Sequence, residues 1–198
     1  FDFETTGLDP EQDRVIEMAA IKVCDGQVIS EFSTLVKNGP VSSKITEITG
    51  ITNEELDHGM PERMAFQTFM RFMGDNVLVA HNAAFDLAFL HFSLMRLADR
   101  TFENQFIDTL TISREKHFYP HKLTDMCQRY EIVLEGAHRA LNDVHGCWEL
   151  LNKFHEEDGI KQWINKLGYL NKYGAPKWAP EHARLFGTDN KYEPRESA

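Results

Sequence analysis

The sequence predicts an α/β fold in which helices cover the faces of a mixed sheet. Phe1–Glu4 alternates apolar and acidic residues, as a half-buried strand does. Two β-branched runs, 15–23 and 28–36, flank Asp25-Gly26, a dipeptide typical of tight β-hairpins. Further along the chain, short apolar runs alternate with helical patterns, which adds helices and more strands to the hairpin.

The remaining elements follow in chain order from periodicity and turn residues. Short helical turns are expected at 44–49 and 53–58. Apolar residues between Met64 and Met73 predict a helix that ends near Gly74. Asn76–Ala80 predicts a short buried strand. Beyond it we expect a helix over 84–97, a strand over 105–108, and helices from Thr109, over 122–130 and over 140–154.

Charge and composition divide the chain into a domain over residues 1–157 and an extension over 158–198. Residues 1–150 carry 13 basic and 24 acidic residues, whereas 151–198 carry 8 and 7. The extension interleaves bases with aromatic residues and lacks periodicity, and its prolines disfavour a continuous helix. We expect it to wrap over the main domain or over a partner.

Composition excludes several classes of protein. With 198 residues, 42% of them hydrophobic, the chain can bury a sizeable core. No run approaches the roughly 18 apolar residues of a membrane span, and no signal-peptide pattern is present. Cys24, Cys127 and Cys147 form no CxxC pair, which favours a reducing compartment and a cytoplasmic location. The formal charge of -10 argues against binding nucleic acid by bulk electrostatics.

Five polar residues form the candidate site: Asp2, Glu4, Asp86, His138 and Asp143. Asp2 and Glu4 are two apart on a strand and so share a face, where their repulsion recruits a cation or raises a pKa. Asp86 falls in the first turn of a helix after a buried strand, and His138 precedes the helix that carries Asp143. Each has a structural alternative: a solvated edge strand, a helix-dipole partner, or a lone structural histidine. Because the first strand is short, we also expect an upstream half-strand outside this numbering.

In this order, the motifs resemble the DEDDh 3′–5′ exonucleases of the DnaQ-like superfamily. They are Phe-Asp-Phe-Glu-Thr-Thr-Gly-Leu at residue 1, His-Asn-Ala-Ala-Phe-Asp at 81, and His-x4-Asp at 138, with supporting stretches at 48–52 and 107–110. The resemblance covers about Phe1 to Leu151 and implies a ribonuclease H-like mixed five-stranded sheet with an antiparallel hairpin at its edge. It implies two Mg²⁺ or Mn²⁺ ions held by Asp2, Glu4, Asp86 and Asp143, with His138 as general base.

The resemblance also implies a loop at Thr5, Thr6 and Leu8 that contacts the 3′-terminal nucleotide. Asn82 is either a substrate contact or a helix cap, and Phe85 is either a stacking platform or a core residue. Asp108 is interpreted as a helix cap rather than a metal ligand. Zinc is not expected, because Pro120 separates His117 from His121 and no cysteine has ligand spacing.

The predicted function is removal of nucleoside 5′-monophosphates from the 3′ end of single-stranded DNA, in proofreading or repair. The Thr-Thr-Gly after the first motif resembles proofreading subunits of bacterial replicative polymerases, so a DNA polymerase or another replication protein is the expected partner. The alternatives are an exoribonuclease that trims short RNA, and a docking module for a polymerase or helicase on the same fold. A non-hydrolytic nucleotide-binding domain is disfavoured, since the chain has no Gly-rich phosphate loop.

Overall fold

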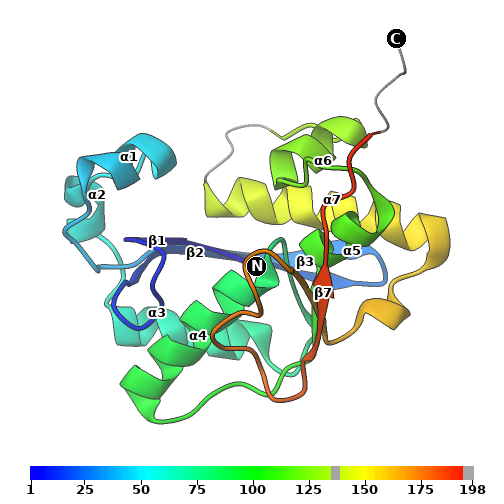
Figure 1. Ribbon diagram of the computed structural model, residues 1–198. Helices are drawn as coiled ribbons and strands as arrows, with labels where there is room; N and C mark the ends of the chain where they lie inside the picture. Colours follow the sequence, from blue (N-terminus) through cyan, green and yellow to red (C-terminus); the bar gives the residue numbers. More distant parts are fainter. Residues whose placement is uncertain (135–138, 194–198) are drawn as a thin grey trace.

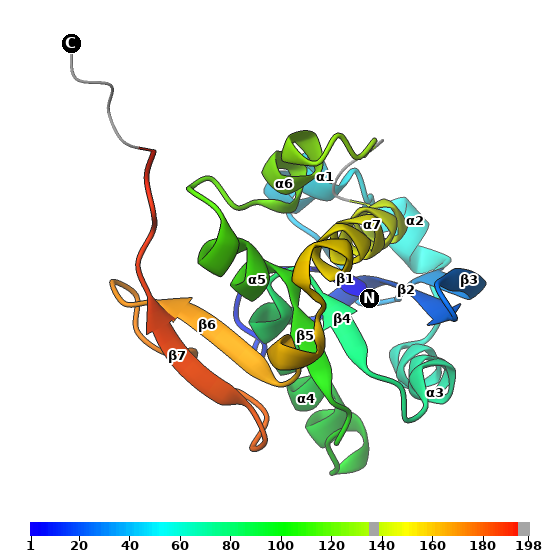
Figure 2. The same cartoon turned by 90° about the vertical axis from the view of Figure 1, so that its right-hand side faces the viewer.

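A computed structural model describes residues 1–134 and 139–193, and it has a mixed α/β architecture (Figure 1). Its strands are β1 (Asp2–Thr5), β2 (Val15–Cys24), β3 (Gln27–Leu35), β4 (Leu78–Ala80), β5 (Phe106–Asp108), β6 (Lys166–Leu170) and β7 (Arg184–Thr188). Its helices are α1 (Ser43–Thr49), α2 (Asn53–Asp57), α3 (Glu62–Met73), α4 (Ala83–Ala98), α5 (Thr109–Lys116), α6 (Leu123–Arg129) and α7 (Ala140–Asp158), with a 3-10 turn, η1, at Lys161–Trp163. Helix α7 covers one face of the central strands, and α3 and α4 lie on the other (Figures 1 and 2).

The β2–β3 hairpin follows the sequence prediction. The two strands pair antiparallel from Glu17 opposite Leu35 to Cys24 opposite Gln27. Asp25 (φ 49°) and Gly26 (φ 76°) both adopt left-handed backbone conformations. A two-residue loop with positive φ at both positions matches the twist of the flanking strands, so this turn fixes the register of the hairpin.

The two central groups of strands meet where β1 of one lies next to β4 of the other. β1 pairs antiparallel with β2, which gives the order β1-β2-β3, while β4 and β5 form a parallel pair. The backbone nitrogen of Phe1 donates a hydrogen bond to the carbonyl oxygen of Val79, 2.7 Å away. Next to this junction, residues 20–23 of β2 and 76–79 of the β4 segment line an apolar cavity of about 130 Å³.

The aromatic core lies between β1 and the helices on its lower face in Figure 1. Phe1 and Phe3 point into this core, where their rings lie 5.8 Å and 5.2 Å from the ring of Phe69 on α3. Phe32 of β3 approaches the same ring at 6.1 Å. Because side chains alternate along a strand, burying Phe1 and Phe3 turns Asp2 and Glu4 toward α7.

The C-terminal extension differs from the prediction of an irregular tail. Its strands β6 and β7 pair in parallel, from Lys166 opposite Arg184 to Leu170 opposite Thr188. No strand pattern was visible because Gly168 and Gly187 interrupt the runs, and because the partners are distant in sequence. The extension packs on the main domain: Leu167 is buried in the aromatic core, and the Trp178 ring stacks on His91 of α4 at 4.2 Å.

Most helix ends fall close to the predicted positions. α4 begins at Ala83 and ends at Ala98, and α3 ends at Met73 before Gly74. α7 extends to Asp158, beyond the predicted end at 154. Within the described part of the chain, no helix combines the length and apolarity needed to cross a lipid bilayer.

Replacing Phe69 by alanine is expected to lower the free energy of unfolding by about 3–5 kcal/mol, because it opens a cavity beside the rings of Phe1, Phe3 and Phe32. Chemical denaturation monitored by circular dichroism measures the loss. The matched control is Phe118→Ala, whose side chain is 41% exposed and which should change stability by less than about 0.5 kcal/mol. Equal effects of the two substitutions would contradict this assignment of the core.

Candidate active site

Three carboxylates converge beneath α7. Asp2 and Glu4 come from β1 and Asp143 comes from the first turn of α7, and each offers an oxygen within 4.8 Å of the others. All three side chains are partly accessible. Among the described residues, this carboxylate cluster is the one group with the spacing of a metal site. Hard carboxylate oxygens at this spacing suit Mg²⁺ or Mn²⁺ better than zinc.

Glu17, a residue that the sequence analysis missed, fixes α7 against the sheet. It lies opposite Glu4 in the β1–β2 register and is 3% exposed. One of its oxygens accepts a hydrogen bond from the backbone nitrogen of Ala140 at 3.1 Å, and the other accepts one from Arg139 Nη2 at 2.9 Å. The carboxylate therefore caps the N-terminus of the helix that carries Asp143. The available signal was a single acid within the apolar run Val15–Val23.

The cluster is electrostatically unfavourable when it has no cation. Burial, followed by the charge of Asp143, raises the pKa of Asp2 from 3.8 to about 7. Burial and then the charge of Asp2 raise the pKa of Glu4 from 4.5 to about 9. A bound divalent cation would favour the ionised carboxylates and offset this repulsion, so the donor set fits the metal ions that the motifs imply.

Asp86 lies beside the cluster but is more deeply buried. It is 3% exposed on the first turn of α4, and its Oδ1 accepts a hydrogen bond from the backbone nitrogen of Phe3 at 3.0 Å. Burial, and then the charge of Asp2, raise the pKa of Asp86 well above its ordinary value. Asp86 thus links α4 to the strand that carries Asp2 and Glu4. His138 belongs to residues 135–138, outside the described residues, and its role stays a prediction.

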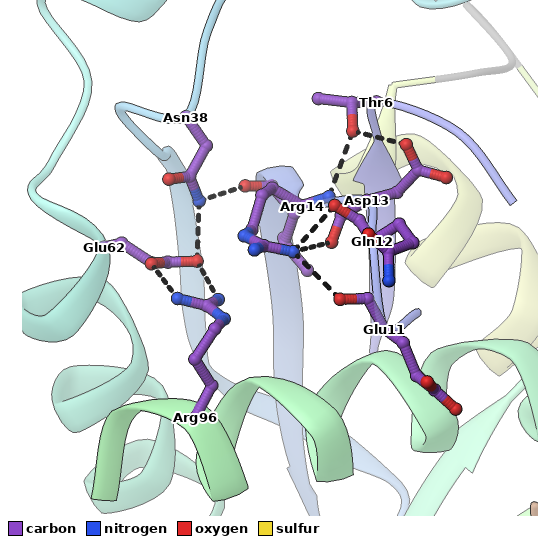
Figure 3. Close-up of polar contacts among 9 residues, drawn as sticks. Thr6, Glu11, Gln12, Asp13, Arg14, Asn38, Glu62 and Arg96 are labelled. Atoms are coloured by element: carbon purple, nitrogen blue, oxygen red, sulfur yellow. Dashed lines mark hydrogen bonds and ion pairs between the residues drawn. The ribbon is translucent and has the colours of Figure 1, made fainter. Parts of the chain in front are cut away.

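The loop after β1 holds its shape through Asp13 (Figure 3). Thr6 Oγ1 donates to Asp13 Oδ1 at 3.0 Å and accepts a hydrogen bond from the backbone nitrogen of Arg14 at 3.0 Å. Asp13 Oδ2 also accepts one from the backbone nitrogen of Asp9 at 2.9 Å. A Cβ atom on Gly7 would lie 2.4 Å from that oxygen, so any other residue at this position would displace the Asp13 carboxylate.

The predicted substrate residues of this loop differ in exposure. Thr5 is buried, and its Oγ1 donates to the carbonyl oxygen of Gly7 at 2.6 Å. Thr6 belongs to the Asp13 contacts, whereas Leu8 is 83% exposed. An apolar side chain that is held so openly at the loop tip is available to a ligand.

A second polar group fastens the base of this loop to the helices below the sheet (Figure 3). Asn38 Nδ2 donates to the carbonyl oxygen of Val15 and to Glu62 Oε1, each at 2.9 Å. Glu62 of α3 also accepts two hydrogen bonds from the guanidinium of Arg96 on α4, at 2.8 and 2.5 Å. These contacts join β2, α3 and α4, and they fix the base of the loop relative to the two helices.

Asp108 caps two helices, and Asn82 caps none. Asp108 Oδ1 accepts hydrogen bonds from the backbone nitrogens of Asn82 and Ala83 at 2.9 and 3.0 Å, and its side chain also caps α5. Its interpretation as a cap is confirmed. Asn82 adopts a left-handed conformation (φ 70°) and its side chain makes no capping bond, so that alternative for Asn82 is wrong. Phe85 packs on Phe89 with ring centres 4.8 Å apart, beside the aromatic core.

The histidines considered for zinc are engaged separately. His117 Nε2 pairs with the Tyr130 hydroxyl at 2.7 Å, while His121 Nδ1 pairs with Ser113 Oγ at 2.9 Å.

Comparison with known proteins defines the class. The RNase_T model, described as exonuclease, matches residues 1–151, and the chain therefore belongs to this family of 3′–5′ exonucleases. Members of the DEDDh family use divalent metal ions. The PolC-type DNA polymerase III of Listeria monocytogenes is 32% identical over 194 residues, which cover 94% of this chain and 13% of the polymerase. The chain thus spans about an eighth of that relative and is homologous to its exonuclease domain.

Solved structures share the fold. A structure of Exonuclease X in complex with 5′-overhanging duplex DNA matches with a TM-score of 0.64 at 23% identity, covering 79% of this chain and 90% of that one. E. coli Exonuclease I in complex with a dA16 oligonucleotide matches with a TM-score of 0.68 at 18% identity, covering 79% of this chain and 40% of that one. Both likenesses show that these two exonuclease structures share this mixed α/β fold.

Stability of the metal-free protein should fall as pH rises. Folding raises the pKa of Glu4 from 4.5 to about 9, so the folded protein retains a proton that the unfolded chain releases above pH 4.5. The favourable contribution of this proton to the free energy of unfolding is fully present below pH 4.5 and is lost as pH rises through 9. At pH 8 in chelator, Glu4→Gln should therefore raise the free energy of unfolding by more than about 1 kcal/mol.

Thermal unfolding across this pH range, with and without Mg²⁺, measures the effect of Glu4→Gln. Mg²⁺ should stabilise the parent protein more than the variant. Glu103→Gln, at an exposed acid, is the control and should alter neither the pH dependence nor the response to Mg²⁺. A Glu4→Gln variant with the parent's pH profile would overturn the electrostatic account of the cluster.

Gly7→Ala should open the loop after β1, because the added methyl group displaces the Asp13 carboxylate. The amides of Asp9 and Arg14 should then exchange with solvent about five- to tenfold faster, the equivalent of one ordinary hydrogen bond. Amide hydrogen exchange followed by NMR measures this. Glu11→Ala is the control, since only the backbone carbonyl of Glu11 takes part in the contacts of Figure 3. Unchanged protection in Gly7→Ala would refute the role of Asp13.

Proposed function

We propose that this chain is a divalent-metal-dependent 3′–5′ exonuclease that shortens single-stranded DNA and releases nucleoside 5′-monophosphates. The observation that carries the proposal is the cluster of Asp2, Glu4 and Asp143 oxygens within 4.8 Å of one another. Membership of the exonuclease family supports the reaction class. The oligonucleotide bound in the related E. coli Exonuclease I structure supports a DNA strand as substrate.

The chemistry assigns separate tasks to the residues of the site. Asp2, Glu4, Asp86 and Asp143 would hold two Mg²⁺ or Mn²⁺ ions, with Asp2, Glu4 and Asp143 forming the cluster within 4.8 Å. When bound, such ions activate water, neutralise charge on the phosphoryl group and assist the leaving oxygen. His138 is proposed to accept the proton of the attacking water, a task that suits an imidazole near neutral pH.

The loop after β1 is proposed to position the 3′-terminal nucleotide. Leu8, at its exposed tip, would contact the terminal base, while the backbone of the loop at Thr5 and Thr6 would lie along the sugar and phosphate. Contacts of this kind recognise the end of a strand with little reading of base identity. Asn82, whose side chain does not cap α4, and the neighbouring Phe85 complete the proposed nucleotide contacts.

The wider setting is proposed to be replication or repair. Similarity to PolC-type DNA polymerase III supports action on mismatched or damaged 3′ ends beside a polymerase or another replication protein. Residues 1–157 would form the catalytic domain, and 158–198 an extension packed on it. The order β3-β2-β1-β4-β5 is proposed as one ribonuclease H-like sheet, supported by the Phe1–Val79 hydrogen bond.

Asp143→Asn should reduce exonuclease activity at least about a hundredfold, because it removes one charged ligand and with it several kcal/mol of transition-state stabilisation. The assay follows stepwise shortening of 5′-labelled single-stranded DNA in Mg²⁺ or Mn²⁺, and identifies the released product. Chelator should stop the reaction.

The control for Asp143→Asn is Asp75→Asn, at an exposed acid away from the cluster, which should retain full activity. RNA of matched sequence, tested in parallel, decides between the DNA and RNA alternatives. Undiminished activity of Asp143→Asn would overturn the site. A parent protein that is inactive on both strands would favour a docking module instead.

A further inference from the structure

A groove connects the candidate active site with the C-terminal extension. One wall comes from residues 81–82 before α4, from α5 and from residues 119–124, and the other comes from residues 170–173 and Asn190. Asp143 of the carboxylate cluster also lines this space, whose volume is about 550 Å³. We name it the extension groove. Its second wall lies outside residues 1–151, the part of the chain that the family model matches.

Unpartnered polar atoms gather in the extension groove. Across residues 1–134 and 139–193, four buried side-chain nitrogen or oxygen atoms lack a hydrogen-bond partner. Three of them belong to groove residues: Arg114 Nε, His121 Nε2 and Asn190 Oδ1. Buried polar groups in folded proteins are almost always paired, so a concentration of unpaired ones marks a place where ordered water or a polar ligand can bind.

His121 supplies a directed donor within this group. The residue is 6% exposed, and its Nδ1 lies 2.9 Å from Ser113 Oγ. When the Ser113 hydroxyl donates to Nδ1, the hydrogen of the neutral ring resides on Nε2. The unpartnered Nε2 is then a buried hydrogen-bond donor behind the groove surface, as is Arg114 Nε.

Cations line both walls of the groove. Arg114 and Lys122 belong to the first wall and Lys172 to the second. Arg114 Nη1 donates to the carbonyl oxygen of Gly168 at 2.9 Å, which leaves the guanidinium its positive charge. None of the ion pairs found within the described residues includes Arg114, Lys122 or Lys172. In a chain with a net charge of -10, this local excess of cations favours an anionic ligand.

Two exposed tyrosines face the same space. Tyr119 is 53% exposed and Tyr173 is 76% exposed, one on each wall. The Tyr119 ring is supported by Tyr192 at 5.7 Å, and Lys172 Nζ lies 4.6 Å from the centre of the Tyr173 ring. Flat aromatic faces beside cations suit a ligand that combines bases with phosphates.

The two walls are joined by backbone contacts. Tyr119 donates its backbone N–H to the carbonyl oxygen of Lys191 at 2.7 Å, and Gly168 donates to Thr111 Oγ1 at 2.8 Å. Lys191 Nζ donates to the carbonyl oxygen of Glu115. The extension is therefore fixed to α5 and to the segment after it, and its side chains keep a defined position relative to Asp143.

We infer that the extension groove holds the single-stranded nucleic acid upstream of the nucleotide being removed, with phosphates on Arg114, Lys122 and Lys172 and bases on Tyr119 and Tyr173. The inference rests on the proposed exonuclease function and adds to it a strand-holding site that the extension completes. The groove gives an acidic protein a local positively charged surface for an anionic strand. The overall charge of the protein does not provide such a surface.

The test compares a long and a short substrate in the full chain. The long one is single-stranded DNA of about a dozen nucleotides, a length within the range of single-strand sites. The short one is the p-nitrophenyl ester of thymidine 5′-monophosphate, which cannot reach the groove. Lys172→Ala with Tyr173→Ala should lower the ratio of kcat/KM on the long substrate to that on the short one by about fivefold or more.

Two further variants test the opposite wall of the groove and provide a control outside it. Lys122→Glu alters the opposite wall and should lower the same ratio. Lys177→Ala removes an exposed extension lysine outside the groove and should leave the ratio unchanged. In addition, fluorescence anisotropy with labelled DNA in chelator measures the binding constant at several salt concentrations. For Lys172→Ala with Tyr173→Ala, the slope of log K against log salt concentration should be less steep by about 0.7 per lost phosphate contact.

The outcomes separate this inference from the proposed function. A parent protein that cleaves both substrates, with groove variants whose ratio is unchanged, overturns the groove and leaves the exonuclease standing. If the parent cleaves neither substrate, the proposed function fails and the anisotropy decides alone. Weaker binding by the groove variants than by Lys177→Ala then supports the strand site, and equal binding overturns it. RNA of matched sequence, included in the binding arm, identifies the preferred strand.

Discussion

Repulsion among closely spaced carboxylates is the constraint on which the rest of this structure depends. Asp2, Glu4 and Asp143 face one another, Asp86 lies beside them, and burial raises the pKa of Asp2 and of Glu4. Such a group persists only where the surrounding structure holds it in place. The aromatic core holds the carboxylates in place, because burying Phe1 and Phe3 on one side of β1 turns the alternate residues toward α7.

Helix α7 is held from the other side by Glu17, a residue whose charge adds to this repulsion. Glu17 adds a further negative charge near the cluster, yet its hydrogen bonds go to Ala140 and Arg139 at the start of α7. The same carboxylate therefore both raises the pKa of Glu4 and fixes the helix that brings Asp143 to it. A site assembled in this way is preorganised for a cation, since its ligands do not have to move together on binding.

Much of the fold was predictable from local sequence signals, but contacts between segments distant in the sequence were not. Asp25-Gly26 specifies its hairpin because both residues tolerate positive φ, and the spacing of Asp2 and Glu4 specifies a shared face. The β6–β7 pair escaped prediction because its stability comes from contacts such as Leu167 in the core, not from its own composition. Similarly, Asn82 resembles a cap in sequence, but the cap comes from Asp108, which is distant along the chain. The role of Glu17 depends on which helix lies above it, and sequence spacing alone does not specify that.

The packing of the extension bears on where this protein can be divided. Residues 1–151 correspond to the family, yet Leu167 is buried in their core and Trp178 covers His91 and the aromatic rings next to it. A protein shortened to the family boundary would present this apolar surface to solvent and leave the Thr111 hydroxyl without Gly168. Exposed apolar surface of this kind promotes aggregation. The unit whose apolar core is fully covered is therefore larger than residues 1–151, the part that the family model matches.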